Sequence, residues 1–125
     1  MYLLGLDIGS TGCKALVFDH DGKILGSGFE EYGIILDQSG KAEQDAENIW
    51  KITCRIIRKA IEKIKSSNIS ALSLSVQGDG IIPVDKNFNA LHNAIHGMDY
   101  RSQPQVKALE KQFDPKEICP QQGPL

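Results

Sequence analysis

Residues 7–14, which read DIGSTGCK, combine the residue types that a metal-bound polyphosphate needs. A carboxylate such as Asp7 can anchor a hydrated Mg²⁺, and it is costly to bury without a cation or hydrogen-bond donors. Glycines let backbone N–H groups approach an anion at positive φ, while hydroxyls and a lysine add donors and positive charge. The segment supplies Gly9, Ser10, Thr11, Gly12 and Lys14 for these roles. It therefore predicts a phosphate-binding turn, with Mg²⁺ held by Asp7 through water.

The turn does not match the better-known phosphate motifs. The sequence contains no GxxxxGK[ST], which excludes a P-loop, and no GxGxxG that opens a helix, which excludes the dinucleotide-binding fingerprint. An ordinary β-hairpin would also use Gly-Ser-Thr-Gly, so a purely structural role stays open at this point.

A second polar segment, QGDG at residues 77–80, follows an apolar stretch. The Asp79 carboxylate can accept hydrogen bonds from two ligand hydroxyls, and its small neighbours leave room for the ligand. Further along, Asp99 and Arg101 are a pair of oppositely charged residues. The alternatives are a plain turn at 77–80 and a local surface ion pair at 99–101.

The elements that position these groups follow from apolar runs and turn residues. The predicted strands are 2–8, 13–19, 23–32, 69–76 and 81–85, with a short apolar stretch at 94–95. Strand 69–76 is expected to be buried on both faces, because its polar members are small serines. Pro83 places strand 81–85 at a sheet edge, and residues 33–44 are expected to be irregular.

The clearest helix begins after Asp45, a good N-cap residue, and Glu47 suits the positive end of the helix dipole. Apolar residues recur with a period near 3.6 up to Ile64, and Ser66-Ser67-Asn68 is expected to end the helix. A second helix is predicted at about 101–112, followed by a loop in the tail. Three antiparallel strands, a helix and a further strand favour an α/β fold, with a ribonuclease-H-like mixed sheet flanked by helices.

Composition narrows the function classes. The chain has 125 residues, 41% hydrophobic and 24% charged, as expected of a globular domain. A net charge of -2 gives no reason to expect nucleic acid or a membrane surface. The spacing of the cysteines and histidines predicts neither a disulfide framework nor a zinc cluster, and favours a reducing compartment, the cytoplasm; these residues are Cys13, Cys54, Cys119, His20, His92 and His96.

Three segments together resemble the FGGY carbohydrate kinases, within the actin-like ATPase superfamily of sugar kinases, heat-shock ATPases and actins. Residues 4–25 are similar to that family's opening, 40–50 (GKAEQDAENIW) to its entry into the first helix, and 69–102 to a segment that ends in Trp-x-Asp-x-Arg. The resemblance covers essentially the whole chain. It implies an actin-like fold, ATP and Mg²⁺ as cofactors, and a sugar or polyol as substrate.

The resemblance also implies roles for single residues. Asp7 would help to place the magnesium nucleotide, and Gly9, Ser10, Thr11, Gly12 and Lys14 would line the phosphate path. Gln77, Gly78 and Asp79 fall where the family contacts substrate hydroxyls, and Asp99 and Arg101 match the positions that brace the sugar site.

Two departures from the family pattern bear on the substrate. Gly97 occupies the Trp position, so an aromatic wall against the sugar would be missing, and Gly78-Asp79 replaces the Met-His pair of D-xylulose kinases. Both departures favour a ketose such as L-xylulose or a polyol such as erythritol over D-xylulose or gluconate.

The resemblance also indicates what the chain lacks. In relatives the general base and the adenosine site lie beyond residue 125, so residues 1–125 are expected to be the N-terminal portion of the first domain, inactive as a kinase alone. A homo-oligomer is compatible with the sequence.

Two other functions stay open. An RNase-H-like nuclease would gather Asp7, Glu47 and Asp79 around two metal ions, although the chain has no basic track for nucleic acid. An actin-like module that binds nucleotide without phosphorylating a sugar is the non-enzymatic alternative.

Overall fold

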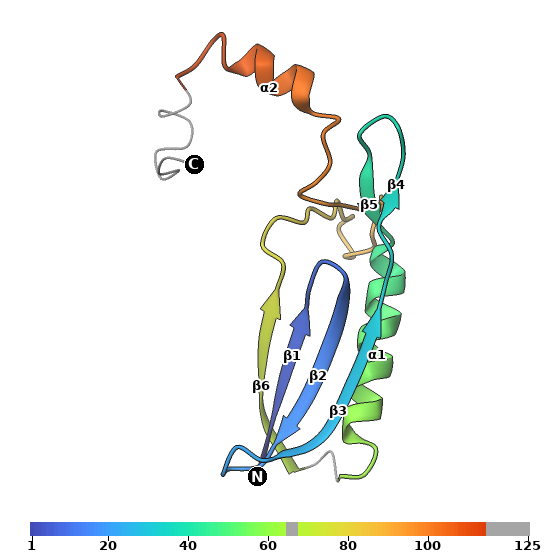
Figure 1. Cartoon of the computed structure of the whole chain (residues 1–125), viewed down its shortest axis with the longest axis vertical. Helices are drawn as coiled ribbons and strands as arrows, with labels where there is room; N and C mark the ends of the chain where they lie inside the picture. Colours follow the sequence, from blue (N-terminus) through green and yellow to red (C-terminus); the bar gives the residue numbers. More distant parts are fainter. Residues whose placement is uncertain (65–67, 115–125) are drawn as a thin grey trace.

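The computed structural model describes residues 1–64 and 68–114. Its main sheet has four strands in the order β3-β2-β1-β6 (Figure 1): β1 Tyr2–Ile8, β2 Gly12–Phe18, β3 Ile24–Glu31 and β6 Ile69–Val76. Neighbours among β1, β2 and β3 are antiparallel, whereas β6 runs parallel to β1. The predicted mixed sheet is therefore confirmed.

Helix α1, Ala46–Ile61, crosses one face of this sheet over β2 and β3. Asp45 caps the helix as predicted, because its carboxylate accepts a hydrogen bond from the Asn48 N–H at 3.0 Å. The helix ends before the predicted stop, of which Ser66 and Ser67 lie outside the described residues.

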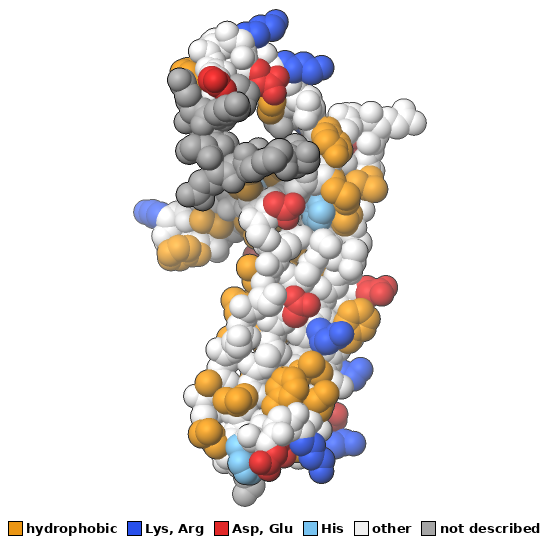
Figure 2. Space-filling view, turned by 60° about the vertical axis from the view of Figure 1, so that its left-hand side comes forward, with side chains coloured by type: hydrophobic (Ala, Val, Ile, Leu, Met, Phe, Trp, Pro, Cys, Tyr) orange, Lys and Arg blue, Asp and Glu red, His pale blue; other side chains and the backbone are white. Residues whose placement is uncertain are grey.

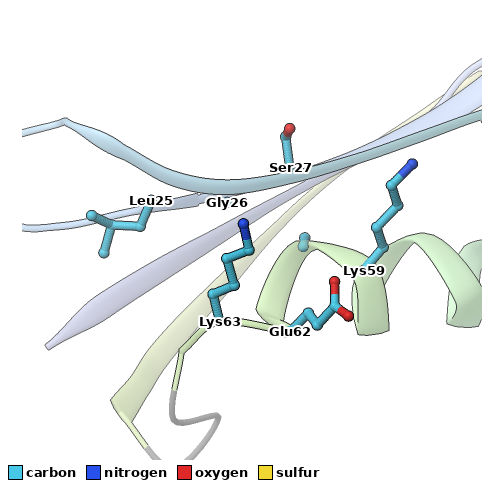
Figure 3. A pocket seen from close by; sticks show the side chains of 7 residues that line it. Leu25, Gly26, Ser27, Lys59, Glu62 and Lys63 are labelled. Carbon is cyan, nitrogen blue, oxygen red and sulfur yellow. The ribbon is translucent and has the colours of Figure 1, made fainter.

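The core lies between α1 and the sheet. The buried side chains there are Leu4, Leu6, Cys13, Ala15, Val17, Tyr32, Ile52, Ile56 and Ala60. β3 comes closest to the helix: a Cβ on Gly26 would lie 2.0 Å from the Ala60 carbonyl oxygen, and one on Gly28 2.2 Å from that of Ile56. Figure 3 shows this end of α1 beneath β3, with Ser27 pointing away from the helix. A larger residue at either glycine would therefore push the two layers apart.

A second, three-stranded sheet has the order β4-β5-β7: β4 Ile35–Leu36, β5 Ala42–Gln44 and β7 Ala94–Ile95. From the sequence, residues 33–44 were expected to be irregular, so β4 and β5, which are only two and three residues long, were missed. All three residues of β5 are buried. The predicted strand 81–85 is wrong as a strand. Ile81 and Val84 instead form isolated bridges, to Ile95 and Ala90.

The prediction that β6 is buried on both faces is also wrong for this structure. Leu72, Leu74 and Val76 are 54%, 55% and 56% exposed, although their register with β1 puts them on the side of the sheet that carries α1. The helix lies over β2 and β3, so it leaves β6 uncovered. Hydrophobic side chains are also exposed at several places on the face shown in Figure 2.

Helix α2, Gln103–Leu109, is shorter than the helix predicted at 101–112. It buries none of its residues and extends away from the main sheet (Figure 1). Within residues 1–64 and 68–114, no helix is long and apolar enough to cross a membrane. The predicted tail loop, with Cys119, lies outside the described residues.

Candidate functional site

The turn between β1 and β2 is stabilised by hydrogen bonds to its carbonyl groups. The Tyr32 hydroxyl donates to the Gly9 carbonyl, and the Tyr32 N–H donates to the Thr11 carbonyl at 3.1 Å. The Gln44 side-chain amide donates to the Ser10 carbonyl at 2.7 Å, and the Gly9 N–H donates to the Gly12 carbonyl at 3.0 Å. All four carbonyls of residues 9–12 are therefore engaged by the protein itself.

The donors of the same turn are left free. Within the described chain, the N–H groups of Ser10 and Thr11 have no acceptor, and both residues are exposed. A turn whose carbonyls are tied to the protein and whose N–H groups face solvent can receive an anion, because the local backbone dipoles then point their positive ends outward.

The glycines of this turn do not serve to allow a positive φ angle, contrary to the expectation from the sequence. Neither Gly9 nor Gly12 has positive φ; Gly22 and Gly40 are the glycines that do, among the residues described. Gly12 is instead required by the neighbouring strand, because a Cβ there would lie 2.8 Å from the Glu30 carbonyl oxygen. The glycine therefore allows β3 to pass close to the turn.

Asp7 and Lys14 lie beside this turn on neighbouring strands. They are paired positions in the β1–β2 ladder, and their side chains lie on the face of the sheet opposite α1. Both line an open pocket of about 280 Å³, together with Ser73 and Ser75 of β6. Asp7 is exposed and forms no ion pair with any described residue. Its carboxylate is thus available for a hydrated cation, a role that fits Mg²⁺.

Gln77 belongs to the support of the turn. Its N–H donates to the Ile8 carbonyl at 3.0 Å, and its side-chain amide donates to the Gln44 side-chain oxygen at 3.3 Å. Since Gln44 in turn donates to Ser10, Gln77 acts on the turn through Gln44. The buried side-chain oxygen of Gln77 has no partner among the described residues, and its predicted contact with substrate stays a prediction.

Asp79 lies directly against Gly97. A Cβ built on Gly97 would be 1.9 Å from the Asp79 Oδ2 atom. Asp79 and Gly78 are both exposed, and a Cβ added to Gly78 would meet open space. The QGDG segment is therefore in contact with the turn at 96–99 through Asp79 and Gly97, which are 18 positions apart in the sequence.

Asp99 and Arg101 do not form an isolated local pair: both belong to a charge network in which the carboxylates are buried and the Arg101 side chain is 38% exposed. The Arg101 Nη2 atom lies 2.6 Å from the Asp99 Oδ2 atom and 2.6 Å from the Glu43 Oε1 atom. Asp99 also accepts a hydrogen bond from the Ala42 N–H at 2.9 Å. Arg101 lowers the pKa of Asp99 well below its usual range, and Asp99 followed by Glu43 raises the pKa of Arg101.

Glu43 is the member of this network that the sequence did not reveal. Its side chain is 1% exposed and lies 3.1 Å from the Lys41 Nζ atom. A hydrogen bond from Asn93, followed by those from Lys41 and Arg101, lowers the pKa of Glu43 to about 2 despite its burial. The polarity of glutamate predicts an exposed position. The one sequence feature that could have pointed to Glu43 is its place in the segment GKAEQDAENIW, which resembles a segment of the family.

The carboxylates of the nuclease alternative are not gathered. No cluster of three His, Cys, Asp or Glu side chains that could hold a metal occurs among the described residues. Glu47 lies in the first turn of α1, in a groove with His92, whereas Asp7 lies on the opposite face of the main sheet. This arrangement does not support two-metal nuclease chemistry.

Comparison with known proteins identifies the family of the chain. Residues 2–125 match the FGGY family of carbohydrate kinases, N-terminal domain. The chain is 34% identical over 121 residues to a probable L-xylulose kinase of Pasteurella multocida, covering 95% of this chain and 25% of that protein. It is 36% identical over 125 residues to a glycerol kinase of Trichormus variabilis, covering 98% of this chain and 25% of that protein.

A solved structure extends the agreement to the fold. The chain superposes on a ligand-bound xylulose kinase from Lactobacillus acidophilus with a TM-score of 0.84 and 28% identity, over 94% of this chain and 24% of that one. The chain thus spans about a quarter of the length of the curated relatives it matches. The predicted ribonuclease-H-like, actin-like fold is confirmed, and the chain belongs to the FGGY family of carbohydrate kinases.

Proposed function

We propose that this protein phosphorylates a hydroxyl group of a ketose or polyol, with ATP as the phosphate donor. The observation that supports the proposal most strongly is the β1–β2 turn, whose four carbonyls are bound inward beside the exposed Asp7. Such a turn offers N–H donors to phosphate oxygens and a carboxylate to the accompanying metal. A xylulose-like ketose is the substrate that the sequence resemblance favours, with a polyol such as erythritol next.

In this proposal the residues divide between two ends of one site. Ser10, Thr11 and Lys14 contact the phosphates, and Asp7 holds Mg²⁺ through water. When bound, the metal neutralises charge on the phosphates. Asp79 accepts hydrogen bonds from substrate hydroxyls, while the network of Asp99 and Arg101 holds the adjacent turn in place.

The assignment of residues 1–125 to the N-terminal portion of the kinase's first domain stays a prediction, as does the position of the general base and the adenosine site outside this chain. We expect the 125-residue chain alone to give no sugar-dependent release of ADP, since it would lack the group that takes the proton from the substrate hydroxyl.

The test of the proposal replaces Asp7 by asparagine in the longest polypeptide that the gene encodes. Asparagine keeps the shape of the side chain but removes the charge that holds the metal, so Mg²⁺-dependent ATP binding measured by calorimetry should weaken on the order of tenfold or more. Asp21→Asn is the matched control, because Asp21 is exposed in the distant turn between β2 and β3.

Equal binding of Mg²⁺-ATP by the Asp7→Asn variant and the control would refute the phosphate site. Tight nucleotide binding without ADP release on any ketose or polyol would instead favour the actin-like module without kinase activity.

A further inference from the structure

The main chain at Gly97 is fixed from several sides. Gly97 lies in a turn that is closed by a hydrogen bond from the Asp99 N–H to the His96 carbonyl at 2.9 Å. The His96 N–H donates to the Ala42 carbonyl of β5 at 2.9 Å, and the Asp99 carboxylate accepts from the Ala42 N–H. A side chain added at residue 97 could therefore not be accommodated by a simple shift of this turn.

Asp79 occupies the space that a side chain at residue 97 would need. A Cβ on Gly97 would lie 1.9 Å from the Asp79 Oδ2 atom, 2.5 Å from its Cγ and 3.2 Å from its Cβ. The two segments are held together nearby by paired backbone hydrogen bonds of 3.0 and 2.8 Å between Ile81 and Ile95. Gly97 does not have positive φ, so its backbone would tolerate alanine. The glycine at this position provides room, and Asp79 fills it.

The Asp79 carboxylate has no partner in the part of the chain that the structure describes. Among residues 1–64 and 68–114, no group donates a hydrogen bond to it or forms an ion pair with it, and the residue is exposed. The nearby Arg101 is already bound to Asp99 and Glu43. A free carboxylate accepts hydrogen bonds from hydroxyls and repels other carboxylates.

We infer that Gly97 and Asp79 form a paired specificity element, in which the missing side chain at 97 sets the position of the Asp79 carboxylate, and that this pair selects neutral polyhydroxy substrates over sugar acids. The inference rests on the proposed function, because it assigns the substrate class of the same site. Asp79 contacts the substrate, and Gly97 is a positioning residue that acts through Asp79.

The variant Gly97→Ala separates this role from a structural one. The atom that the new methyl group would meet is the free end of a flexible side chain, so the Asp79 carboxylate rotates away and the fold is retained. Substrate binding then loses a hydrogen bond to a charged group. We expect KM for a neutral substrate to rise on the order of tenfold or more, with kcat changed much less, because the contact is made before and during reaction alike.

The experiment measures kcat and KM in the longest encoded polypeptide for a panel of neutral ketoses and polyols and for gluconate. The variants are Gly97→Ala, Asp79→Asn and the double variant, and Gly33→Ala is the control, because a Cβ at Gly33 meets open space. Both single variants should raise KM for the preferred neutral substrate and narrow its advantage over gluconate. The double variant should add little to either, since both changes act on one carboxylate.

Three results would overturn the inference while leaving the proposed function intact: a KM for Gly97→Ala equal to that of Gly33→Ala, fully additive losses in the double variant, or unfolding of Gly97→Ala at a temperature where Gly33→Ala stays folded. A wild-type protein that phosphorylates no member of the panel would refute the proposed function, and the inference with it.

Discussion

Replacing Tyr32 by phenylalanine removes one hydroxyl group and tests whether its hydrogen bond to Gly9 stabilises the β1–β2 turn, the proposed phosphate site. Tyr32 is 8% exposed; its hydroxyl donates to the Gly9 carbonyl, and its N–H donates to the Thr11 carbonyl. Phenylalanine keeps the ring and the N–H, so the variant loses the Gly9 hydrogen bond alone. A partly buried carbonyl left without its donor costs about 1–3 kcal/mol. Because Gly9 retains some access to water, we expect the free energy of unfolding to fall by about 1–2 kcal/mol.

The pH dependence of stability provides a second test of the same contact. Burial, with smaller contributions from Cys13 and Asp7, raises the pKa of Tyr32 to about 12 from an ordinary value of 10.0. The folded state therefore favours the neutral hydroxyl. This contribution is fully present below the unfolded pKa and is lost as the pH rises from about 10 through 12. The wild-type protein should lose stability over this range more steeply than Tyr32→Phe.

Urea unfolding followed by circular dichroism at pH 7, 10 and 11 measures both effects. Tyr100→Phe makes the same chemical change at a side chain that is 63% exposed, and it should behave like the wild type. If Tyr32→Phe is as stable as Tyr100→Phe at pH 7, and loses stability as steeply above pH 10, the hydroxyl does not hold the turn and the reasoning is wrong.

Two further predictions concern packing and charge. Gly28→Ala should lower the free energy of unfolding by about 1–3 kcal/mol, because its methyl group would lie 2.2 Å from the Ile56 carbonyl oxygen. Gly33→Ala is the control, because a Cβ at Gly33 meets open space and should change the free energy of unfolding little. Equal urea midpoints for the two variants would contradict the close packing of α1 on β3. Since the pKa of Glu43 is lowered from 4.5 to about 2, its contribution to stability is present above pH 4.5 and is lost as the pH falls through 2. Glu43→Gln should therefore be less stable than the wild type at pH 7 but lose less stability between pH 4.5 and 2, and acid unfolding curves of equal steepness would count against the network around Arg101.

The sequence predicted best the elements whose signals are local. Asp45 was identified as the N-cap of α1 because a cap depends on a few neighbouring residues. The turn at residues 9–12 was identified because it joins two strands that are adjacent in the sequence. The three-residue strand β5 was missed for the opposite reason. Its partners in β7 lie about 50 residues further along the chain, and nothing near Glu43 indicates that a carboxylate there is buried.

The same distinction explains what the sequence could and could not predict about the site. Asp7 and Lys14 were assigned to one segment from the sequence, and the structure makes them paired positions of β1 and β2. Such a pairing follows from the register of a hairpin, whereas their roles in binding stay predictions. The open faces of β6 were not anticipated, since small serines and apolar residues are typical of a strand covered on both sides. The contact between Asp79 and Gly97 depends on the path of two loops, which no local pattern specifies.

The three residues of β5 connect the two ends of the proposed site. Gln44 holds the Ser10 carbonyl of the phosphate turn, Glu43 holds Arg101, and the Ala42 N–H holds the Asp99 carboxylate. Because consecutive residues of one strand cannot move independently, a displacement of the β1–β2 turn would be carried to the turn at 96–99, which Asp79 contacts. These contacts also explain how residues as polar as Glu43 and Gln44 are buried: each side chain is hydrogen-bonded to a different part of the proposed site.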